Sequence, residues 1–444
     1  MKVKLAPLYF KSGKDQEFDK QLGNLKDLLC DVAEIIEPVS ILSYNKNLEA
    51  KIDAVIFPQL IGDAFEQINY IKKIKVPIIV ATSDFGTVNM WDWEIVSFMQ
   101  AEGISPFAPY DLDYTKKICR SLAVKKSLIN ANFLVFQDNP GAGGMQGEIF
   151  RRFYWWQDRY IKLLKERFGL NLIIESFKSL GQKAKSLPES QVEKVLKSFD
   201  IKTNSVSESA LKSAIRFYMV LKDELENHSN VIGIGVNCLN ESFYSDSTPC
   251  LAWNLLYEEK KILWACEADT LSLLTNYIIN KSLSVPVMMS NVYPFLMGSS
   301  ALKHEKIDKF PQVEEPENHM LIVHCGYFGV VPQSFASSWV LKPKVLEIVN
   351  DNATAIDARF EEGDIVIAKL DPTLKKLMAV EGSLKGYVQY PGSDCRNGAL
   401  VKVSNGYKLM NAFYSHHNCV IKGKRFIDID NIISKVFGLE ITGI

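Results

Sequence analysis

Two carboxylates follow a short apolar run near the middle of the chain. The segment "KILWACEADTLSLLTNYI", Lys261 to Ile278, begins like a buried strand and ends like an amphipathic helix, with Cys266, Glu267 and Asp269 between the two halves. Burying an unpaired carboxylate costs several kcal/mol or more. We therefore expect these acids to have a partner such as a metal ion, a cation or a substrate.

The position of the acids at a strand exit favours a role in chemistry. In open parallel sheets, ligands bind outside the carboxyl ends of the strands. Glu267 directly follows the apolar run, and we interpret it as a catalytic residue. Asp269 is a second catalytic candidate, but it stands just before "TLSL" and has an alternative role as the cap of the next helix.

Histidines in apolar runs are the second group that could do chemistry. His324 ends the run "MLIV", and His416 and His417 precede Cys419 in another strand-like run. Each of them alone would more often be a satisfied core histidine. Since three of the six histidines lie in such runs, together with the strand-end carboxylates, the sequence predicts a site with oxygen and imidazole ligands for a metal ion.

Glycine-rich segments offer a competing interpretation that the spacing disfavours. "FLVFQDNPGAGGMQGEIF" has a strand, a glycine-rich turn and a helix, as a dinucleotide-binding segment does. Its glycines do not follow G-x-G-x-x-G, and no Lys-Ser/Thr follows them to form a P-loop. In "VIGIGVNCL", Gly233 and Gly235 lie inside a strand pattern and predict close packing against a helix.

Two α/β segments must position these residues. From residue 1 to 136, the runs "VKLAPLYF", "DAVIFPQL" and "VPIIVATSD" predict buried parallel strands, with helices expected at Phe18 to Ile36 and Phe65 to Lys73. From 137 to 290, strands including "LNLIIESF" and "NVIGIGVNCL" again alternate with helices, and "VPVMMSNVYPF" ends this part. Both segments are typical of doubly wound, Rossmann-like α/β domains.

A β-barrel domain is expected from 291 to 444. Short strands such as "HMLIVHCGYFGVV", "GDIVIAKLD" and "HHNCVIKGKRFIDI" are separated there by Gly, Asn and Pro. This pattern predicts a β-barrel or sandwich that is closed by a helix over Ile429 to Phe437.

The overall charge, the apolar runs and the cysteines indicate which partners and which compartment to expect. The 444 residues carry 51 Lys+Arg and 52 Asp+Glu, and a net charge of -1 gives no reason to expect nucleic acid or an anionic membrane. The sequence shows neither a signal peptide nor an apolar run of the roughly 18 residues that a membrane span needs. Eight cysteines without a C-x-x-C pair are typical of a reducing compartment, so we expect a cytoplasmic protein.

Several motifs together resemble those of a known superfamily. "NVIGIGVNCL", the CEAD-type segment at Cys266, "VPVMMSNVYPF", "HCG", "PGSDCRNGA" and "SHHNCVIKG" occur in the order found in the L-fucose/L-arabinose isomerase-like superfamily. The similarity covers roughly the second half of the chain. It implies two N-terminal α/β domains, a C-terminal β-barrel and a homo-oligomer with sites near subunit interfaces.

The resemblance also implies a reaction and a ligand set. Members interconvert aldoses and ketoses through a cis-enediol, with a divalent ion, commonly Mn²⁺, holding two oxygens of the sugar. Glu267 matches the first glutamate ligand, which also transfers a proton. One of the histidine pair, preferably His417, matches the ligand from the barrel. Asn291 or His324 would give weaker help to the metal, and His324 and His416 are candidates for substrate binding. Arg396 in "DCRNG" is a candidate for contact with substrate hydroxyls or a phosphate, and a turn-stabilising ion pair is its alternative.

The chain departs from the family at one ligand. Where fucose isomerases carry a second acidic ligand that doubles as acid/base, this sequence has Asn291 in "MMSNVYPF". An amide oxygen can bind a hard cation, but it is neutral and cannot accept the substrate proton. Either Asp269 or Glu381 takes over that role, or the reaction differs. The rival hypothesis is a sugar-binding or regulatory homologue without turnover.

Overall fold

The contacts divide the chain into two compact units, each of which is described by itself. The computed structural model describes residues 2–60, 63–138, 158–239, 241–298, 312–324, 331–344, 350–389 and 397–444. The first unit comprises Met1–Ser127, Lys281–Ser284 and Asp430–Gly438. The second comprises Leu128–Asn280, Val285–Ile429 and Leu439–Ile444.

A parallel sheet forms the centre of the first unit. Its order is β2-β1-β4-β5, with β3 also beside β1, and these strands are β1 (Val3–Tyr9), β2 (Ala33–Ile35), β3 (Val39–Ser40), β4 (Ala54–Phe57) and β5 (Ile78–Val80). The helices are α1 (Gln16–Leu28), α2 (Lys46–Glu49), α3 (Asp63–Glu66), α4 (Ile68–Ile71), α5 (Trp93–Ala101) and α6 (Leu112–Ser127). The three strands that the sequence predicts here are confirmed.

The helices of this unit are shorter than the sequence predicts. Helix α1 begins after Asp15, whose carboxylate accepts a hydrogen bond from the Phe18 amide at 2.7 Å. It ends at Leu28, because the backbone of Leu29 leaves the helical region at φ -105° and ψ 6°. The helix expected over Phe65 to Lys73 is divided between α3 and α4 at Gln67.

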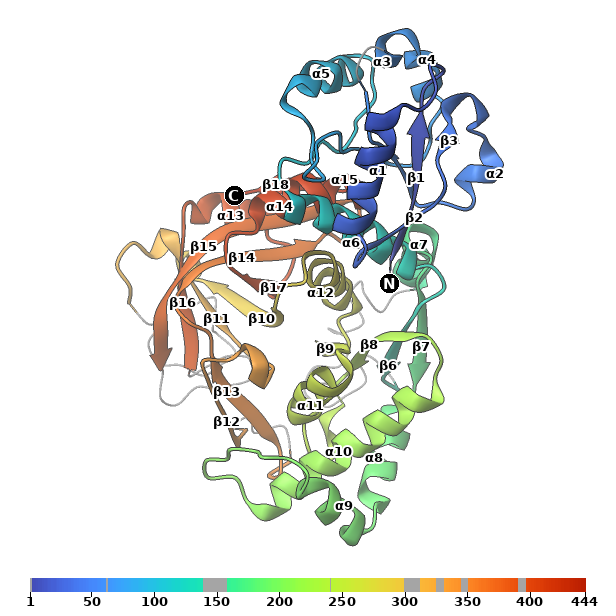
Figure 1. Ribbon diagram of the computed structural model, residues 1–444. Helices are drawn as coiled ribbons and strands as arrows, with labels where there is room; N and C mark the ends of the chain where they lie inside the picture. The colour runs from blue at the N-terminus through green and yellow to red at the C-terminus, as the bar shows by residue number, and fades with distance from the viewer. Residues whose placement is uncertain are drawn as a thin grey trace. The chain divides into compact units, whose positions relative to one another are not determined.

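A second parallel sheet opens the second unit. Its order is β7-β6-β8-β9, formed by β6 (Asn132–Phe136), β7 (Asn171–Glu175), β8 (Val231–Val236) and β9 (Leu263–Cys266). The helices between the strands are α7 (Asp158–Phe168), α8 (Phe177–Ser186), α9 (Glu189–Leu196), α10 (Glu208–Asn227), α11 (Cys250–Lys260) and α12 (Thr270–Leu283). Helix α10 packs against α8, α9 and α11 (Figure 1). The glycine-rich turn of "FLVFQDNPGAGG" lies outside the described residues.

The same unit contains a closed antiparallel barrel. Six strands follow the order β14-β17-β10-β11-β16-β15, and pairing of β14 with β15 closes the ring. These strands are β10 (Val287–Pro294), β11 (His319–Val323), β14 (Gly363–Leu370), β15 (Lys376–Gln389), β16 (Asn397–Val403) and β17 (His417–Lys422). Strand β18 (Glu440–Gly443) adds to β15, and β12 (Ser338–Pro343) pairs with β13 (Thr354–Arg359). The predicted mixed α/β class with a C-terminal barrel is confirmed.

Two elements differ in placement from the prediction. Strand β10, expected at the end of the second α/β segment, pairs with β11 and β17 in the barrel, because a continuous apolar run does not distinguish a parallel strand from a barrel strand. The helical stretch expected to close the barrel is α14 (Phe426–Asp428), a π-helical turn (Ile429–Ile433) and α15 (Ser434–Phe437). Helix α15 belongs to the first unit, where Lys125 Nζ donates to the Val436 carbonyl at 2.7 Å.

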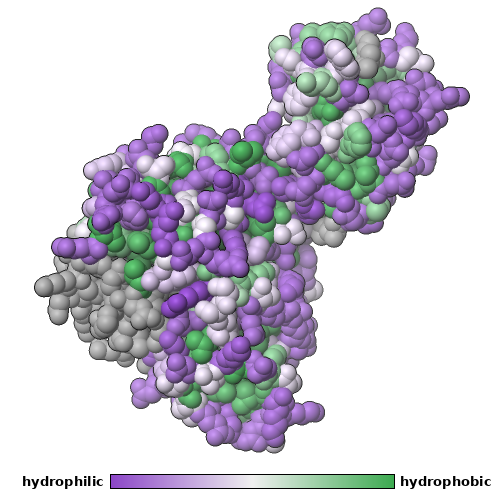
Figure 2. Space-filling view, turned by 60° about the vertical axis from the view of Figure 1, so that its left-hand side comes forward, coloured by the Kyte–Doolittle hydropathy of each residue, from purple (hydrophilic) through white to green (hydrophobic). Residues whose placement is uncertain are grey.

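Hydrophilic side chains cover much of the face drawn in Figure 2, and apolar side chains appear there in small groups. Within the described ranges, no helix has both the length and the apolarity needed to cross a membrane.

Candidate metal centre

Glu267 lies in a left-handed turn at the end of β9. Both Glu267 and Ala268 have positive φ, at 52° and 57°. The turn is fixed by hydrogen bonds from the Ala268 amide to the Val236 carbonyl, at 3.1 Å, and from the Asp269 amide to the Cys266 carbonyl, at 3.0 Å. Left-handed backbone costs roughly 1–2 kcal/mol for each residue that has a Cβ. Such strain is often concentrated at functional sites, where it fixes the direction of a side chain.

The glycines of β8 make room for this turn. A Cβ added at Gly235 would lie 3.3 Å from the Cα of Ala268, so a side chain there would press on the turn itself. A Cβ at Gly233 would meet the side chain of Leu273 on α12, at about the same separation. The predicted close packing against a helix is thus confirmed at Gly233, whereas Gly235 packs against the turn that carries Glu267.

The barrel brings two histidines to the same place. His417 is the first residue of β17, and it pairs with Asn291 of β10 in antiparallel register. The Val292 amide donates to the His416 carbonyl at 2.8 Å and fixes the approach to the strand. Residues directly opposite each other in an antiparallel pair project to the same side of the sheet, so Asn291 and His417 are neighbours.

Glu267, His416 and His417 form a cluster whose ligand atoms all lie within 4.8 Å of one another. Nε2 of His417 is 3.7 Å from Oε1 of Glu267, and the two imidazole rings are 4.0 Å apart between centroids. Glu267 and His417 are buried, and His416 is half-buried. Two imidazoles and one carboxylate are the donor types that hold divalent transition metals, so this Glu/His/His group could hold a metal ion.

Asp269 lies behind His417 in a dense hydrogen-bond network. It is fully buried, and its Oδ2 lies 3.1 Å from Nδ1 of His417 and 2.9 Å from Nζ of Lys369. The Ser272 amide donates to its Oδ1 at 2.9 Å, and the Ser272 hydroxyl donates to Oδ2 at 2.8 Å. The contact with the Ser272 amide is an N-terminal helix cap, the alternative that the sequence offers for this residue.

The network alters the pKa of both partners. Burial acts to raise the pKa of Asp269, but the charge of Lys369 and the hydrogen bond from His417 outweigh it and hold the pKa well below its usual range. Burial likewise acts to lower the pKa of His417, and the negative charge of Glu267 with the hydrogen bond to Asp269 raises it to about 9. The two carboxylates therefore both favour the positively charged form of this imidazole.

The remaining predicted site residues are not members of the Glu/His/His group. Asn291 directs its amide nitrogen to the Tyr293 hydroxyl at 3.2 Å, and its buried Oδ1 accepts no hydrogen bond from the described residues. His324 is buried with the ring of Trp264 at 6.3 Å between centroids, and it is not part of the Glu/His/His group. Glu381 is exposed on β15. Arg396 lies outside the described residues.

Lys369 and Ser272 belong to the site but were missed by the sequence analysis. Lys369 is fully buried near the end of β14, and it donates to both Asp269 and the Ser272 hydroxyl. Helix α12 lies beside this end of β14, where the Leu370 amide also donates to Thr275 at 3.2 Å (Figure 1). The only signal in the sequence was a lysine that interrupts the end of the apolar run "DIVIAKL".

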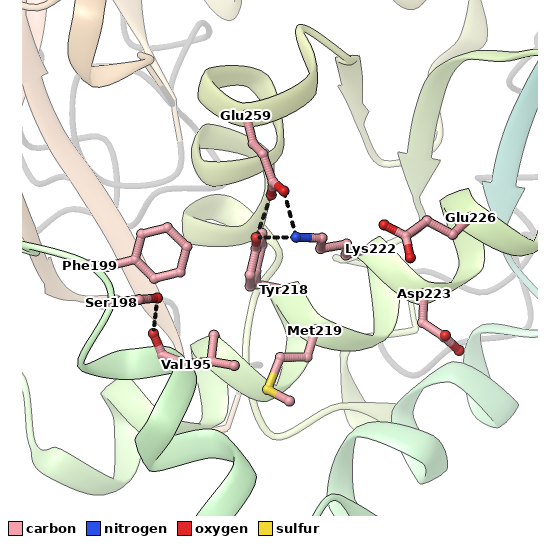
Figure 3. A pocket seen from close by; sticks show the side chains of 9 residues that line it. All are labelled: Val195, Ser198, Phe199, Tyr218, Met219, Lys222, Asp223, Glu226 and Glu259. Carbon is pink, nitrogen blue, oxygen red and sulfur yellow. Dashed lines mark hydrogen bonds and ion pairs between the residues drawn. The ribbon is translucent and has the colours of Figure 1, made fainter.

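A cavity elsewhere in the second unit is not associated with this cluster. It has a volume of about 490 Å³ and lies between α9, α10 and α11 (Figure 3). Glu259 points from α11 toward α10, where it accepts hydrogen bonds from the Tyr218 hydroxyl and from Lys222. Because these polar groups satisfy one another, the cavity presents little unpaired chemistry to a ligand, and the Glu/His/His cluster remains the stronger candidate site.

No family model matches the chain, and no curated protein is significantly similar to it.

Proposed function

We propose that this protein is a metal-dependent aldose–ketose isomerase of the L-fucose/L-arabinose isomerase-like type. The observation that carries the proposal is the convergence of Glu267, from the end of a parallel strand, with His416 and His417, from a barrel strand. The CEAD-type and histidine-pair motifs that suggest the superfamily are thus the segments that meet in space. Two doubly wound α/β domains, an oligomer with sites near subunit interfaces and a small sugar as partner are parts of the same proposal.

The donor set fits a divalent transition metal. Glu267, His416 and His417 would hold the ion, and the Oδ1 of Asn291, which accepts no hydrogen bond from the described residues, offers a neutral oxygen on the same side of the sheet as His417. Imidazole ligands favour Mn²⁺, Co²⁺ or Zn²⁺ over Ca²⁺, which prefers sites made wholly of oxygen. Such an ion supplies a Lewis acid that polarises the sugar carbonyl and its neighbouring hydroxyl.

Glu267 is the group that would move the proton. Isomerisation takes a proton from the carbon beside the carbonyl and returns it to the neighbouring carbon, which requires a base held within hydrogen-bond reach. The left-handed backbone at Glu267 and Ala268 fixes the direction of this carboxylate. Asp269 is fully buried and is engaged by His417, Lys369 and Ser272, so its contacts favour a supporting role over direct proton transfer.

Metal analysis and substrate incubation together test the proposal. Purified protein should bind Mn²⁺ or Co²⁺ with a stoichiometry of about one, and with added Mn²⁺ it should convert an aldopentose or a deoxyaldohexose into the ketose. Glu267→Gln should lose both properties because it removes the anionic ligand while keeping the shape of the side chain. Glu226→Gln, which changes an exposed glutamate paired with Lys260, is the matched control and should behave like the wild type. Absence of metal binding in the wild type would refute the proposal.

Asn291 favours a second candidate function, a sugar-binding or regulatory homologue without turnover. In the resembled family this position carries an acid, and the amide found here cannot take a proton. Raised thermal stability with sugars, in the absence of bound metal and of any conversion, would support this alternative over the isomerase.

A further inference from the structure

We infer that Lys369 is a positioning residue of the metal centre, which acts through Asp269 to hold His417 in its ligand orientation. The inference rests on the proposed function, since it assigns a part in metal binding to a residue outside the ligand set. Neither the sequence motifs nor the resemblance points to this lysine.

Placing a lysine at this buried position has a free-energy cost. Lys369 is fully buried, and burial lowers the pKa of its ammonium group despite the opposing effect of Asp269. Desolvating an ion pair costs several kcal/mol for each ion, and apolar residues of similar volume often replace such a pair without loss of stability. Stability alone therefore gives a weak reason for Lys369, which points to another role.

Three side chains contact the same carboxylate oxygen of Asp269. Oδ2 of Asp269 lies 2.9 Å from Lys369 Nζ and 3.1 Å from His417 Nδ1, and it also accepts a hydrogen bond from the Ser272 hydroxyl. Lys369 in turn donates to that hydroxyl. The contacts with Lys369 and with the Ser272 hydroxyl thus fix the orientation of this carboxylate, so that its Oδ2 faces the imidazole.

The contact with Asp269 orients the ring of His417. With Nδ1 donating to Asp269, the other ring nitrogen, Nε2, faces Oε1 of Glu267 at 3.7 Å. A carboxylate behind a histidine ligand sets the tautomer and the ring orientation, and loss of such a partner typically weakens metal binding 10–100-fold. Lys369, from β14, adds a cation behind that carboxylate. Asp269 comes from the turn that caps α12, and His417 comes from β17.

Two variants separate positioning from folding. Lys369→Met keeps the apolar stem but leaves Asp269 with less compensation in the core. The double variant Lys369→Met/Asp269→Asn removes both charges together and retains a side chain that can cap α12. Lys342→Met is the matched control, because it removes a partly buried ion pair with Asp357, 2.7 Å away, on strands β12 and β13 of the same unit.

The measurements are Co²⁺ affinity, the visible absorption spectrum of bound Co²⁺ and the midpoint of thermal unfolding. Positioning predicts that the double variant keeps a midpoint close to that of the wild type, binds Co²⁺ about 10–100-fold more weakly and shows an altered spectrum. Lys369→Met, where it folds, should show the same two changes in Co²⁺ binding, and Lys342→Met should show neither.

The outcomes distinguish this inference from the proposed function. If the wild type binds Co²⁺ and the double variant binds it equally well with the same spectrum, the role of Lys369 is overturned while the metal centre stands. If the wild type binds neither Co²⁺ nor Mn²⁺, the proposed function is overturned and this inference with it.

Discussion

Charge is unevenly distributed among the side chains of the candidate centre. Glu267 faces the two imidazoles, whereas the second carboxylate, Asp269, lies 2.9 Å from the ammonium group of Lys369. The negative charge of Asp269 is thus largely compensated, and Asn291 adds a dipole without a charge. A divalent cation therefore meets about one uncompensated carboxylate, and we expect moderate affinity with a strong dependence on each ligand.

Restoring an acid at position 291 should strengthen the centre. Asn291 lies opposite His417 across β10 and β17, so Asn291→Asp would add a negative charge beside the cluster without a change of size. We expect the affinity for Mn²⁺ to rise at least about 10-fold, equivalent to about 1.4 kcal/mol. Isothermal titration of metal-free protein measures this directly. Asn411→Asp, the same change at an exposed position of α13 (Gly406–Ala412), controls for a general effect of added charge.

An unchanged affinity in Asn291→Asp would contradict the placement of residue 291 beside the metal. Affinity that rises without any isomerase activity would instead favour the binding homologue, since the missing acid would not be the sole obstacle to turnover.

Among the elements, the turn between β9 and α12 matters most because it aims Glu267. Gly235→Ala should distort this turn, since the new Cβ would lie 3.3 Å from the Cα of Ala268 and backbone yields less readily than a side chain. Overpacking of this kind costs roughly 1–3 kcal/mol. We expect this loss in the free energy of unfolding, measured in urea, together with weaker binding of Co²⁺.

Gly233→Ala provides the matched comparison on the same strand. Its Cβ would meet the side chain of Leu273, at 3.0 Å, and not the turn. It should therefore lower stability while leaving Co²⁺ affinity nearly unchanged. Equal losses of affinity in the two variants would show that the close packing of Gly235 against the turn does not position Glu267.

The C-terminal end of α10 offers a pH-dependent contribution to stability. His228 Nδ1 donates to the Glu224 carbonyl at 2.8 Å, and Nε2 lies 3.3 Å from Glu175 of β7. The hydrogen bond to the Glu224 carbonyl raises the pKa of His228, and Glu175 adds to this effect against the opposing influence of burial. A folded-state pKa above the unfolded value means that the protonated ring stabilises the fold at low pH, and that this contribution disappears as pH rises through the folded-state pKa.

His228→Gln should therefore destabilise the protein more in acid than in base. The difference in the free energy of unfolding between about pH 5.5 and about pH 9 should be about 0.5–1 kcal/mol, the scale of a cation at a helix C-terminus. Glu175→Gln should reduce this pH dependence without abolishing it, because the carbonyl contact remains. A loss of stability that is the same at both pH values would contradict the assignment.

The sequence predicts where the strands and helices around the site lie better than it predicts which strands and side chains pair with each other. Strands β8 and β9 and the start of α12 follow from apolar runs and turn residues, so the exit position of Glu267 could be predicted. The pairing of β10 with β17 could not, because an uninterrupted apolar run suits both a parallel sheet and a barrel. The ion pair between Asp269 and Lys369 joins residues 100 positions apart, and a lysine near a strand end gives no sign that tertiary packing will bury it.

At the scale of the whole molecule, contacts group the second parallel sheet and the barrel into one unit. Hydrogen bonds between the Thr248 hydroxyl and the backbone of Thr354, and between Glu258 and Ser334, join the α/β part to strand β13 and the segment before β12. Every residue of the Glu/His/His cluster, with Asp269 and Lys369 behind it, lies within this second unit. The first unit contributes none of the described candidate ligands.

Metal binding should therefore protect the second unit selectively against opening. A ligand that binds only the folded state stabilises it by about 2.7 kcal/mol when its concentration is 100 times the dissociation constant. Hydrogen exchange followed by mass spectrometry, with and without Co²⁺, should show slower exchange in peptides that contain β9, β10 and β17, and little change in peptides that contain β1 and β4. Glu267→Gln should show no protection in either set, since it removes the anionic ligand. Protection of β1 and β4 equal to that of β9 and β17 would contradict a centre built within the second unit, because the binding energy would then be shared by strands that supply no ligand.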